Sequence, residues 1–362
     1  MKRTLLVLAL FALVAFAGNF ATGGAELAKF KGYGMFRWTS FGSEVDPVDA
    51  AIGNEFGGKV WMAWVPKLND YADLCISMTD VAAIEFDQVY LNMKLTDCIS
   101  LTGGQIKLPF GYGYTRSGGS MLFADRTSTV SGSGSPTSDF GIYGGLDIGA
   151  QVTGNWAPVT VDIMFSNGTG ARAQADTTIN KQLTARLAVE PTEWLTVGGS
   201  VAMIGQPELI EDADTTESWS SNGIDVFAVA NYPVSPTGTF NFVGEYMMLG
   251  TPSNDVDGFV LHDGARMSVM GGYDIKLDGN VVLAVQPAVR FDTIDPIAAW
   301  ADDADEPEDN ETIIDFCVGI DLFTNLNTLQ LGMRNYSWEN DDVDNGGTES
   351  YSDMYVNWRM NF

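Results

Sequence analysis

The last stretch of the chain, residues 351–362, alternates apolar and polar side chains with a period of two. Its polar positions include Asp353, Asn357, Arg359 and Asn361, and its apolar positions are Met354, Val356, Trp358, Met360 and Phe362. This is the period of a β-strand with one apolar and one polar face. A soluble β-sandwich can use the same alternation. A row that ends on an aromatic residue favours a membrane barrel, because such a row contacts acyl chains and its end aromatic lies in the interface.

Segments of this kind recur from Leu27 onward, and the connections between them switch regularly between short and long. An even number of antiparallel strands with short turns at one end and longer loops at the other is typical of bacterial outer-membrane barrels. We therefore predict an all-β fold, a closed transmembrane antiparallel barrel of about 16 strands whose first and last strands pair. The segments are 27–38, 57–66, 70–79, 83–96, 98–108, 141–154, 159–167, 179–190, 194–205, 223–232, 238–249, 264–274, 280–292, 312–323, 328–338 and 351–362.

Two of the apolar rows contain no charged residue, as contact with lipid requires. The first is formed by Ile142, Leu146, Ile148 and Val152, and the second by Val281, Leu283, Val285, Val289 and Phe291. Pro287 lies in the second row and cannot donate a hydrogen bond to a neighbouring strand, so we expect a bulge or a strand end there. The terminal strand also resembles the signal by which the barrel assembly machinery recognises outer-membrane proteins.

The amino-terminal residues predict export. Lys2 and Arg3 precede an apolar run from Leu5 to Phe16 and an Ala-x-Ala site, which is the pattern of a secretory signal peptide. We expect cleavage after Ala17, so that residues 1–17 are the signal peptide and residues 18–362 the outer-membrane barrel. No later stretch has the ~18 uninterrupted apolar residues of a spanning helix. The expected location is the outer membrane of a Gram-negative bacterium, with its lipid and lipopolysaccharide as partners.

The chain is strongly acidic, with 19 Lys and Arg against 47 Asp and Glu. Loss of Lys2 and Arg3 leaves 17 against 47, a net charge of −30, which excludes nucleic acid as a partner. Much of the acid is grouped in three expected loops, residues 208–217, 302–311 and 339–344. These loops are either solvated tips or a mouth that collects cations. The three cysteines, at positions 75, 98 and 317, lack metal-ligand spacing, and we expect neither a metal nor a cofactor.

The alternation of residues along each strand assigns the remaining charged residues to one of the two faces of the sheet. Bases and acids in nearly equal number alternate with the apolar rows and are expected to line a water-filled interior, which predicts weak selectivity among small ions and hydrophilic solutes. The expected lumen-lining bases are Lys94, Arg186, Arg266, Arg290, Arg334 and Arg359, with Lys107 on the same face. The inward acids include Asp147, Asp162, Asp225, Glu245, Asp315, Asp321 and Asp353.

Two motifs at the start of the long connection after residue 108 resemble those of a known family. Gly104-Gln105-Ile106-Lys107-Leu108-Pro109-Phe110-Gly111 resembles the Gly-x-x-Lys-x-Pro-Phe-Gly signature of the phosphate-selective porins O and P, and Phe123-Ala124-Asp125-Arg126 resembles that family's Phe-x-x-Arg element. The resemblance implies a trimeric porin of sixteen strands with the third loop folded into the lumen. It also implies that Lys107, Arg116 and Arg126 lie at the pore constriction. The acidic mouth departs from the lysine-rich mouth of the phosphate-selective members, so an anion (phosphate)-selective channel is the alternative to a weakly selective one.

Two other classes of function are rivals to a channel. A hydrolase needs a nucleophile, a base and an orienting group within hydrogen-bond reach, and the only histidine is His262, expected in a loop beside Asp263. We therefore expect no enzyme. A structural or adhesive barrel that anchors the envelope is the better rival, because the same pattern of strands would build it.

Overall fold

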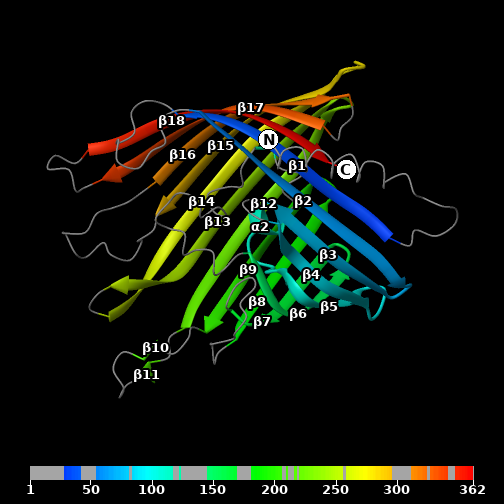
Figure 1. The fold of residues 1–362 in the computed structure, drawn as a ribbon, viewed down its shortest axis with the longest axis vertical. Helices are drawn as coiled ribbons and strands as arrows, with labels where there is room; N and C mark the ends of the chain where they lie inside the picture. Colours follow the sequence, from blue (N-terminus) through cyan, green and yellow to red (C-terminus); the bar gives the residue numbers. More distant parts are fainter. Residues whose placement is uncertain are drawn as a thin grey trace.

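The computed structural model describes residues 28–41, 54–80, 84–116, 122–123, 145–168, 181–205, 209–210, 216–217, 220–255, 258–295, 311–323, 327–340 and 347–361. Sixteen strands of these residues form one closed antiparallel barrel (Figure 1). They are β1 (Ala28–Phe41), β2 (Asn54–Asn69), β3 (Ala72–Asp80), β4 (Ile84–Lys94), β5 (Ile99–Lys107), β6 (Leu146–Trp156), β7 (Val159–Ser166), β8 (Gln182–Thr192), β9 (Leu195–Gly205), β12 (Ser220–Ser235), β13 (Gly238–Asp255), β14 (Gly258–Lys276), β15 (Val282–Asp295), β16 (Glu311–Leu322), β17 (Asn327–Asn340) and β18 (Gly347–Asn361).

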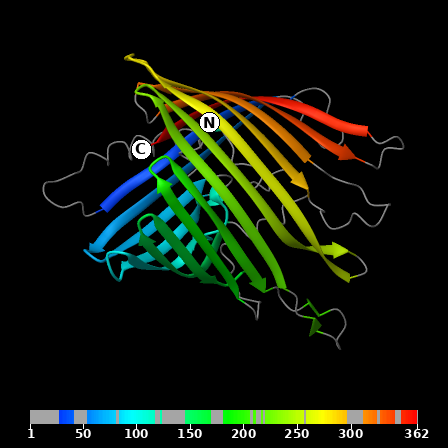
Figure 2. The same ribbon diagram turned by 180° about the vertical axis from the view of Figure 1, so that it is seen from behind.

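The barrel closes between its first and last strands. Each barrel strand pairs with the next one along the chain, β9 pairs with β12, and β1 pairs with β18 in a register that runs from Tyr33 opposite Asn361 to Phe41 opposite Asp353. The view from behind shows the two ends of the strand series side by side (Figure 2). Closure leaves no strand edge unpaired, which satisfies the backbone in a membrane. The predicted antiparallel barrel of 16 strands, with its terminal strands paired, is confirmed.

Each predicted segment overlaps one barrel strand, but several strands are longer than predicted. Strands β13 and β14 pair as far as Asp255 opposite Gly258, well beyond the segments expected from the apolar rows. The apolar pattern marks only the lipid-facing part of a strand, whereas backbone hydrogen bonds extend the ladder into polar sequence. Two short elements were not predicted: the hairpin of β10 (Leu209–Ile210) and β11 (Thr216–Glu217), and the helix α2 (Tyr112–Thr115).

The two faces of the sheet differ as the alternation predicts. On β7 the exposed fraction of successive side chains is 8% for Asp162, 48% for Ile163, 0% for Met164 and 58% for Phe165. Large apolar side chains are thus exposed on the outer face, and polar or tightly packed side chains are buried on the inner face. Ile148, Val152, Val289 and Phe291 of the two predicted lipid-facing rows are exposed in this way, while Ile142 lies outside the described residues.

The bulge or strand end predicted at Pro287 is wrong. Strand β15 runs through this residue, which lies opposite Val318 of β16 without a change of register there. On the other side, the pairing of β15 with β14 is interrupted between Val285 and Ala288 but resumes in the same register. Proline has no N–H group, and the hydrogen-bonded ladder between β14 and β15 is therefore interrupted locally. The strand itself is not displaced.

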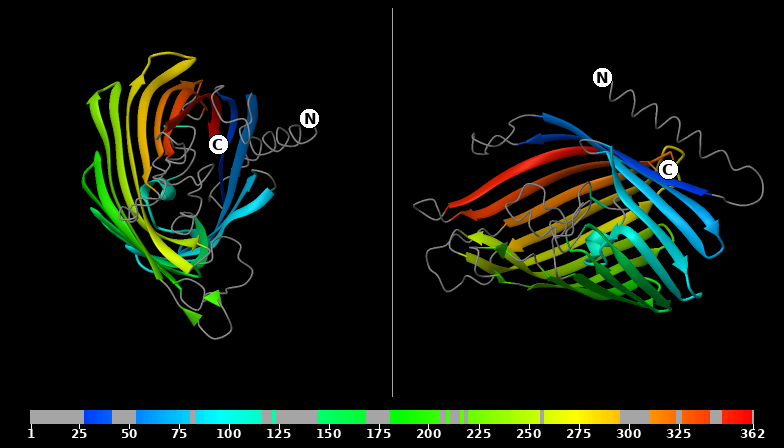
Figure 3. Two further views of the ribbon diagram at one scale, coloured as in Figure 1. Left: turned by 90° about the vertical axis from the view of Figure 1, so that its left-hand side faces the viewer. Right: turned by 60° about the horizontal axis from the view of Figure 1, so that its bottom comes forward.

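Among the described residues, no helix is both long enough and apolar enough to cross a membrane. The short helix α2, coloured teal, lies inside the ring of strands in Figure 3.

Candidate functional site

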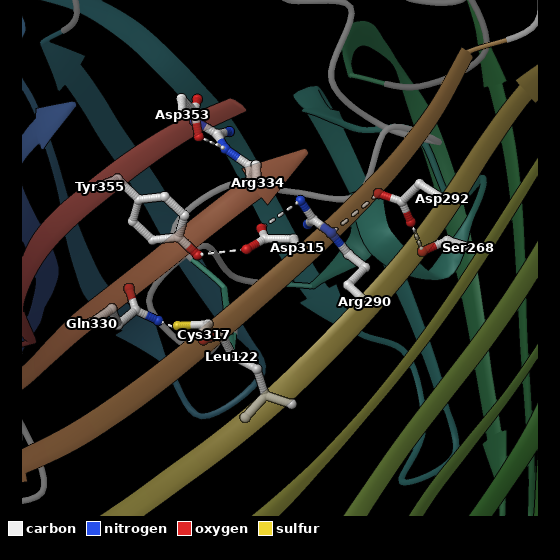
Figure 4. Close-up of polar contacts among 10 residues, drawn as sticks. All are labelled: Leu122, Ser268, Arg290, Asp292, Asp315, Cys317, Gln330, Arg334, Asp353 and Tyr355. Atoms are coloured by element: carbon white, nitrogen blue, oxygen red, sulfur yellow. Dashed lines mark hydrogen bonds and ion pairs between the residues drawn. The ribbon is translucent and has the colours of Figure 1, made fainter. Parts of the chain in front are cut away.

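The inner wall over strands β14 to β18 carries a network of ion pairs. The Arg290 guanidinium lies between two carboxylates, with Nε 3.1 Å from Oδ2 of Asp292 and Nη2 3.1 Å from Oδ2 of Asp315. The Tyr355 hydroxyl donates to Oδ1 of Asp315 at 3.0 Å, and the Ser268 hydroxyl donates to Oδ1 of Asp292 (Figure 4). All five side chains are buried. Buried charges are tolerated only when they are paired in this way.

A second pair continues the network on the neighbouring strands. Arg334 of β17 donates to Asp353 of β18 through Nε at 3.0 Å and Nη2 at 2.6 Å, which is a bidentate contact. The same guanidinium lies 5.2 Å from the ring centroid of Tyr355. The planar fork of an arginine matches a carboxylate in this geometry and orders both side chains. This part of the wall therefore holds two arginines and three aspartates in paired contacts.

The acids of the opposite wall are also held by hydrogen bonds. Asp162 accepts from the Thr153 hydroxyl at 2.7 Å and from Gln151 Nε2 at 3.0 Å, and Nη1 of Arg186 lies 3.5 Å from its Oδ2. The Arg186 guanidinium also lies 5.1 Å from the ring centroid of Phe227 on β12. Thus inward acids and bases predicted from parity do share one face, and Asp162 and Arg186 form a cross-strand pair on it.

The connection that follows β5 contacts the inner wall at two places. We define the first anchor as residues 111–113. The Gly111 N–H donates to the Ser200 hydroxyl at 2.9 Å, and that hydroxyl donates to Asp225 at 2.8 Å. The N–H groups of Tyr112 and Gly113 donate to Oε1 of Glu245 at 2.5 and 3.2 Å. These contacts link the start of α2 to β9, β12 and β13, strands far from β5 in the barrel order.

We define the second anchor as Leu122 and Phe123, which contact strands β14 to β18. The Leu122 carbonyl accepts from Gln330 Nε2 at 2.7 Å, and the Cys317 sulfur lies 3.8 Å from the same oxygen. Phe123 packs with Cys317 and Tyr355 in one buried cluster. Residues 117–121 and 124–144 of this connection lie outside the described residues.

The three predicted constriction residues have different outcomes. Arg116 follows α2, and its Nη1 donates to the Tyr112 hydroxyl at 3.1 Å. Lys107, placed on the inward face by parity, lies opposite Leu146 of β6. It is the last residue of β5, and its Nζ still reaches the Arg116 carbonyl at 3.5 Å. Arg126 lies outside the described residues. A constriction formed by all three stays a prediction.

The predicted lumen-lining bases lie on the inner face, but most are not in open water. Arg266, Arg290, Arg334 and Arg359 are buried, Arg186 is largely covered, and Lys94 is exposed at the turn end of β4. In the terminal strand Met354 and Trp358 are exposed on the outer face, as predicted, and Phe362 lies outside the described residues. The role of that strand in assembly stays a prediction.

His262 does not lie in a loop as predicted. It belongs to β14, opposite Thr251 of β13. Among the parts of the chain that the structure describes, no group of three or more His, Cys, Asp or Glu residues is arranged to hold a metal ion.

Three contact residues were not predicted as parts of a site: Ser200, Glu245 and Tyr355. Glu245 was predicted only to face inward, and its partners are 132 and 133 residues away along the chain. Tyr355 offered a weak signal, because it is an aromatic residue on the otherwise polar face of the last strand. Phe123 was identified from the sequence only as part of the Phe-x-x-Arg motif of the third loop, and in the structure it packs on the inner wall.

Solved structures with the same fold are outer-membrane proteins. OprB of Pseudomonas putida matches with a TM-score of 0.64 at 11% identity, over 93% of this chain and 94% of that chain. The outer membrane channel DcaP of Acinetobacter baumannii matches with a TM-score of 0.61 at 12% identity, over 92% and 97%. An anion-selective porin from Comamonas acidovorans matches with a TM-score of 0.59 at 10% identity, over 92% and 99%.

No protein-family model matches the sequence, and no curated protein matches it. At identities this low, the structural likeness shows the fold, which is the closed barrel of outer-membrane channels and porins.

Proposed function

We propose that this chain is an outer-membrane porin, a water-filled channel for the passive diffusion of small hydrophilic solutes and ions. One observation carries the proposal: a closed barrel of 16 strands exposes apolar side chains on its outer face and gathers charged and polar side chains on its inner face. A barrel of this strand number encloses an interior wide enough for water. Transport is favoured over catalysis because the inner-wall charges pair with one another, whereas an active site needs a nucleophile held against a base.

Three finer features belong to the same proposal. The connection after β5 narrows the channel, and its two anchors on the inner wall support this. The assembly is a homotrimer in the outer membrane, and a signal peptide at residues 1–17 directs its export.

The Gly104–Gly111 motif supports kinship with the phosphate-selective porins O and P, while the acidic mouth argues against a dedicated phosphate site. A structural barrel that anchors the envelope is the rival, and solute flux separates the two.

The proposal is tested by swelling of liposomes that contain the purified protein, diluted into isosmotic neutral sugars. The expected result is rapid swelling with a small sugar and progressively slower swelling with larger ones, because a hydrated pore sieves by size. Liposomes with heat-unfolded protein are the control. A rate equal to that control for every sugar contradicts a channel and favours an anchoring barrel.

A further inference from the structure

Phe123 is buried in an unusual place. It belongs to a connection between strands, yet only 2% of its surface is exposed, because its ring packs on Cys317 and Tyr355 of the inner wall. On another side, the Arg290 guanidinium lies 4.9 Å from the ring centroid, within the range of a cation–π contact. The ring therefore covers the centre of the ion-pair network of β14 to β18.

The covered groups would otherwise face the interior of the barrel. Arg290 and Asp315 project from the inner face of β15 and β16, and Figure 4 shows them beside Tyr355 and Cys317. In a channel, water and ions would compete for these charges if they were accessible. Contact with Phe123 instead leaves Arg290 and Asp315 almost dry, which strengthens the interaction between them.

The backbone beside the ring is fixed as well. The Gln330 amide donates to the Leu122 carbonyl, and Asn357 Nδ2 donates in turn to Gln330 Oε1 at 2.6 Å, which fixes the orientation of that amide. At the other anchor, Glu245 and Ser200 hold residues 111–113. The chain from Gly113 to Leu122 is thus tied at both ends to the inner wall, at β9 to β13 and at β16 to β17.

We propose that Phe123 is a positioning residue of the channel: it pins the connection after β5 to the wall of β14 to β18 and seals the Arg290 network from the water in the lumen. This inference rests on the proposed channel function. Loss of the ring should free the second anchor, widen the path for ions, and admit water to Arg290, Asp315 and the Cys317 thiol beneath it.

The thiol of Cys317 provides a direct readout. Cys75, Cys98 and Cys317 are free, so replacement of Cys75 and Cys98 by alanine leaves Cys317 as the single target. The probe is a small anionic methanethiosulfonate, which forms a mixed disulfide with the thiol and releases methanesulfinate. In this background Cys317 should react slowly, and Phe123→Ala should raise its rate at least about tenfold, because local opening then exposes it. Single-channel conductance should rise in the same variant.

Matched variants separate pinning from general damage. Phe123→Leu keeps an apolar cap and should return both the labelling rate and the conductance toward the values of the background protein. Phe291→Ala removes the neighbouring aromatic of β15 on the outer face and should change neither. Gln330→Ala removes the donor to the Leu122 carbonyl and the acceptor for Asn357 but keeps the Phe123 ring, and it should raise both readouts by a smaller factor. Heat-modifiable migration on a detergent gel verifies that each variant is folded.

The outcomes are distinct. The inference is overturned if Cys317 is labelled fast while Phe123 is present. It is also overturned if labelling and conductance are unchanged in a folded Phe123→Ala variant. Neither result contradicts the proposed channel function. A background protein that conducts no current overturns the proposed function itself.

Discussion

Replacement of Arg290 by methionine is expected to lower the free energy of unfolding by ~3–5 kcal/mol, the usual cost of breaking a buried ion pair from one side. The reason is that Asp292 and Asp315 are 0% and 1% exposed and would lose the cation that lies 3.1 Å from each. Unfolding by urea in lipid vesicles, followed by tryptophan fluorescence, measures the change.

Two further variants identify the cause of this loss. Lys67→Met removes the cation of an exposed pair, whose side chains are 53% and 86% exposed, and should leave the free energy of unfolding nearly unchanged. Asp315→Asn added to Arg290→Met removes one of the stranded charges and should recover part of the loss. If Arg290→Met costs no more than Lys67→Met, the network is solvated and the wall is not dry as described.

Replacement of Val289 by arginine is expected to destabilise the folded barrel by ~2–4 kcal/mol, the cost of a cation near the bilayer midplane. Val289 lies near the middle of β15 and is 43% exposed on the outer face. An exposed side chain on a protein surrounded by water tolerates the same change within about 0.5 kcal/mol. The size of the loss in vesicles therefore reports directly whether this face contacts lipid.

The matched control is Leu277→Arg. Leu277 is 44% exposed, nearly the same as Val289, but it lies in the short turn between β14 and β15, where an arginine reaches the interface at a cost of about 0–1 kcal/mol. Equal losses at the two positions would contradict a depth-dependent lipid environment.

The strand layout could be predicted from sequence because each strand carries its own signal. A period of two in Ile148 and Val152, or in Met354 and Trp358, depends on which face meets lipid and needs no knowledge of neighbouring strands. Loop lengths then give the antiparallel order. The same local pattern does not mark where a strand ends, so the extension of β13 and β14 as far as Asp255 opposite Gly258 was not predicted.

The inner wall could be predicted only in part. Parity identified Arg290, Asp315 and Arg334 as inward, but which base meets which acid depends on the register between strands. The partners of the two anchors were out of reach of the sequence, since those of Tyr112 and Leu122 are 133 and 208 residues distant along the chain. The near balance of inward charges predicted weak selectivity, whereas burial of the ion pairs shows that a charge count alone overstates what an ion would meet.

Whether a water-filled channel runs through the barrel is measured by adding the purified folded protein to a planar lipid bilayer in potassium chloride under a fixed voltage. The expected result is stepwise current of uniform, ohmic increments that scale with salt concentration, because ions cross through hydrated pores. A membrane that stays silent, although labelled protein is shown to have inserted, would contradict a channel and identify the barrel as an anchor.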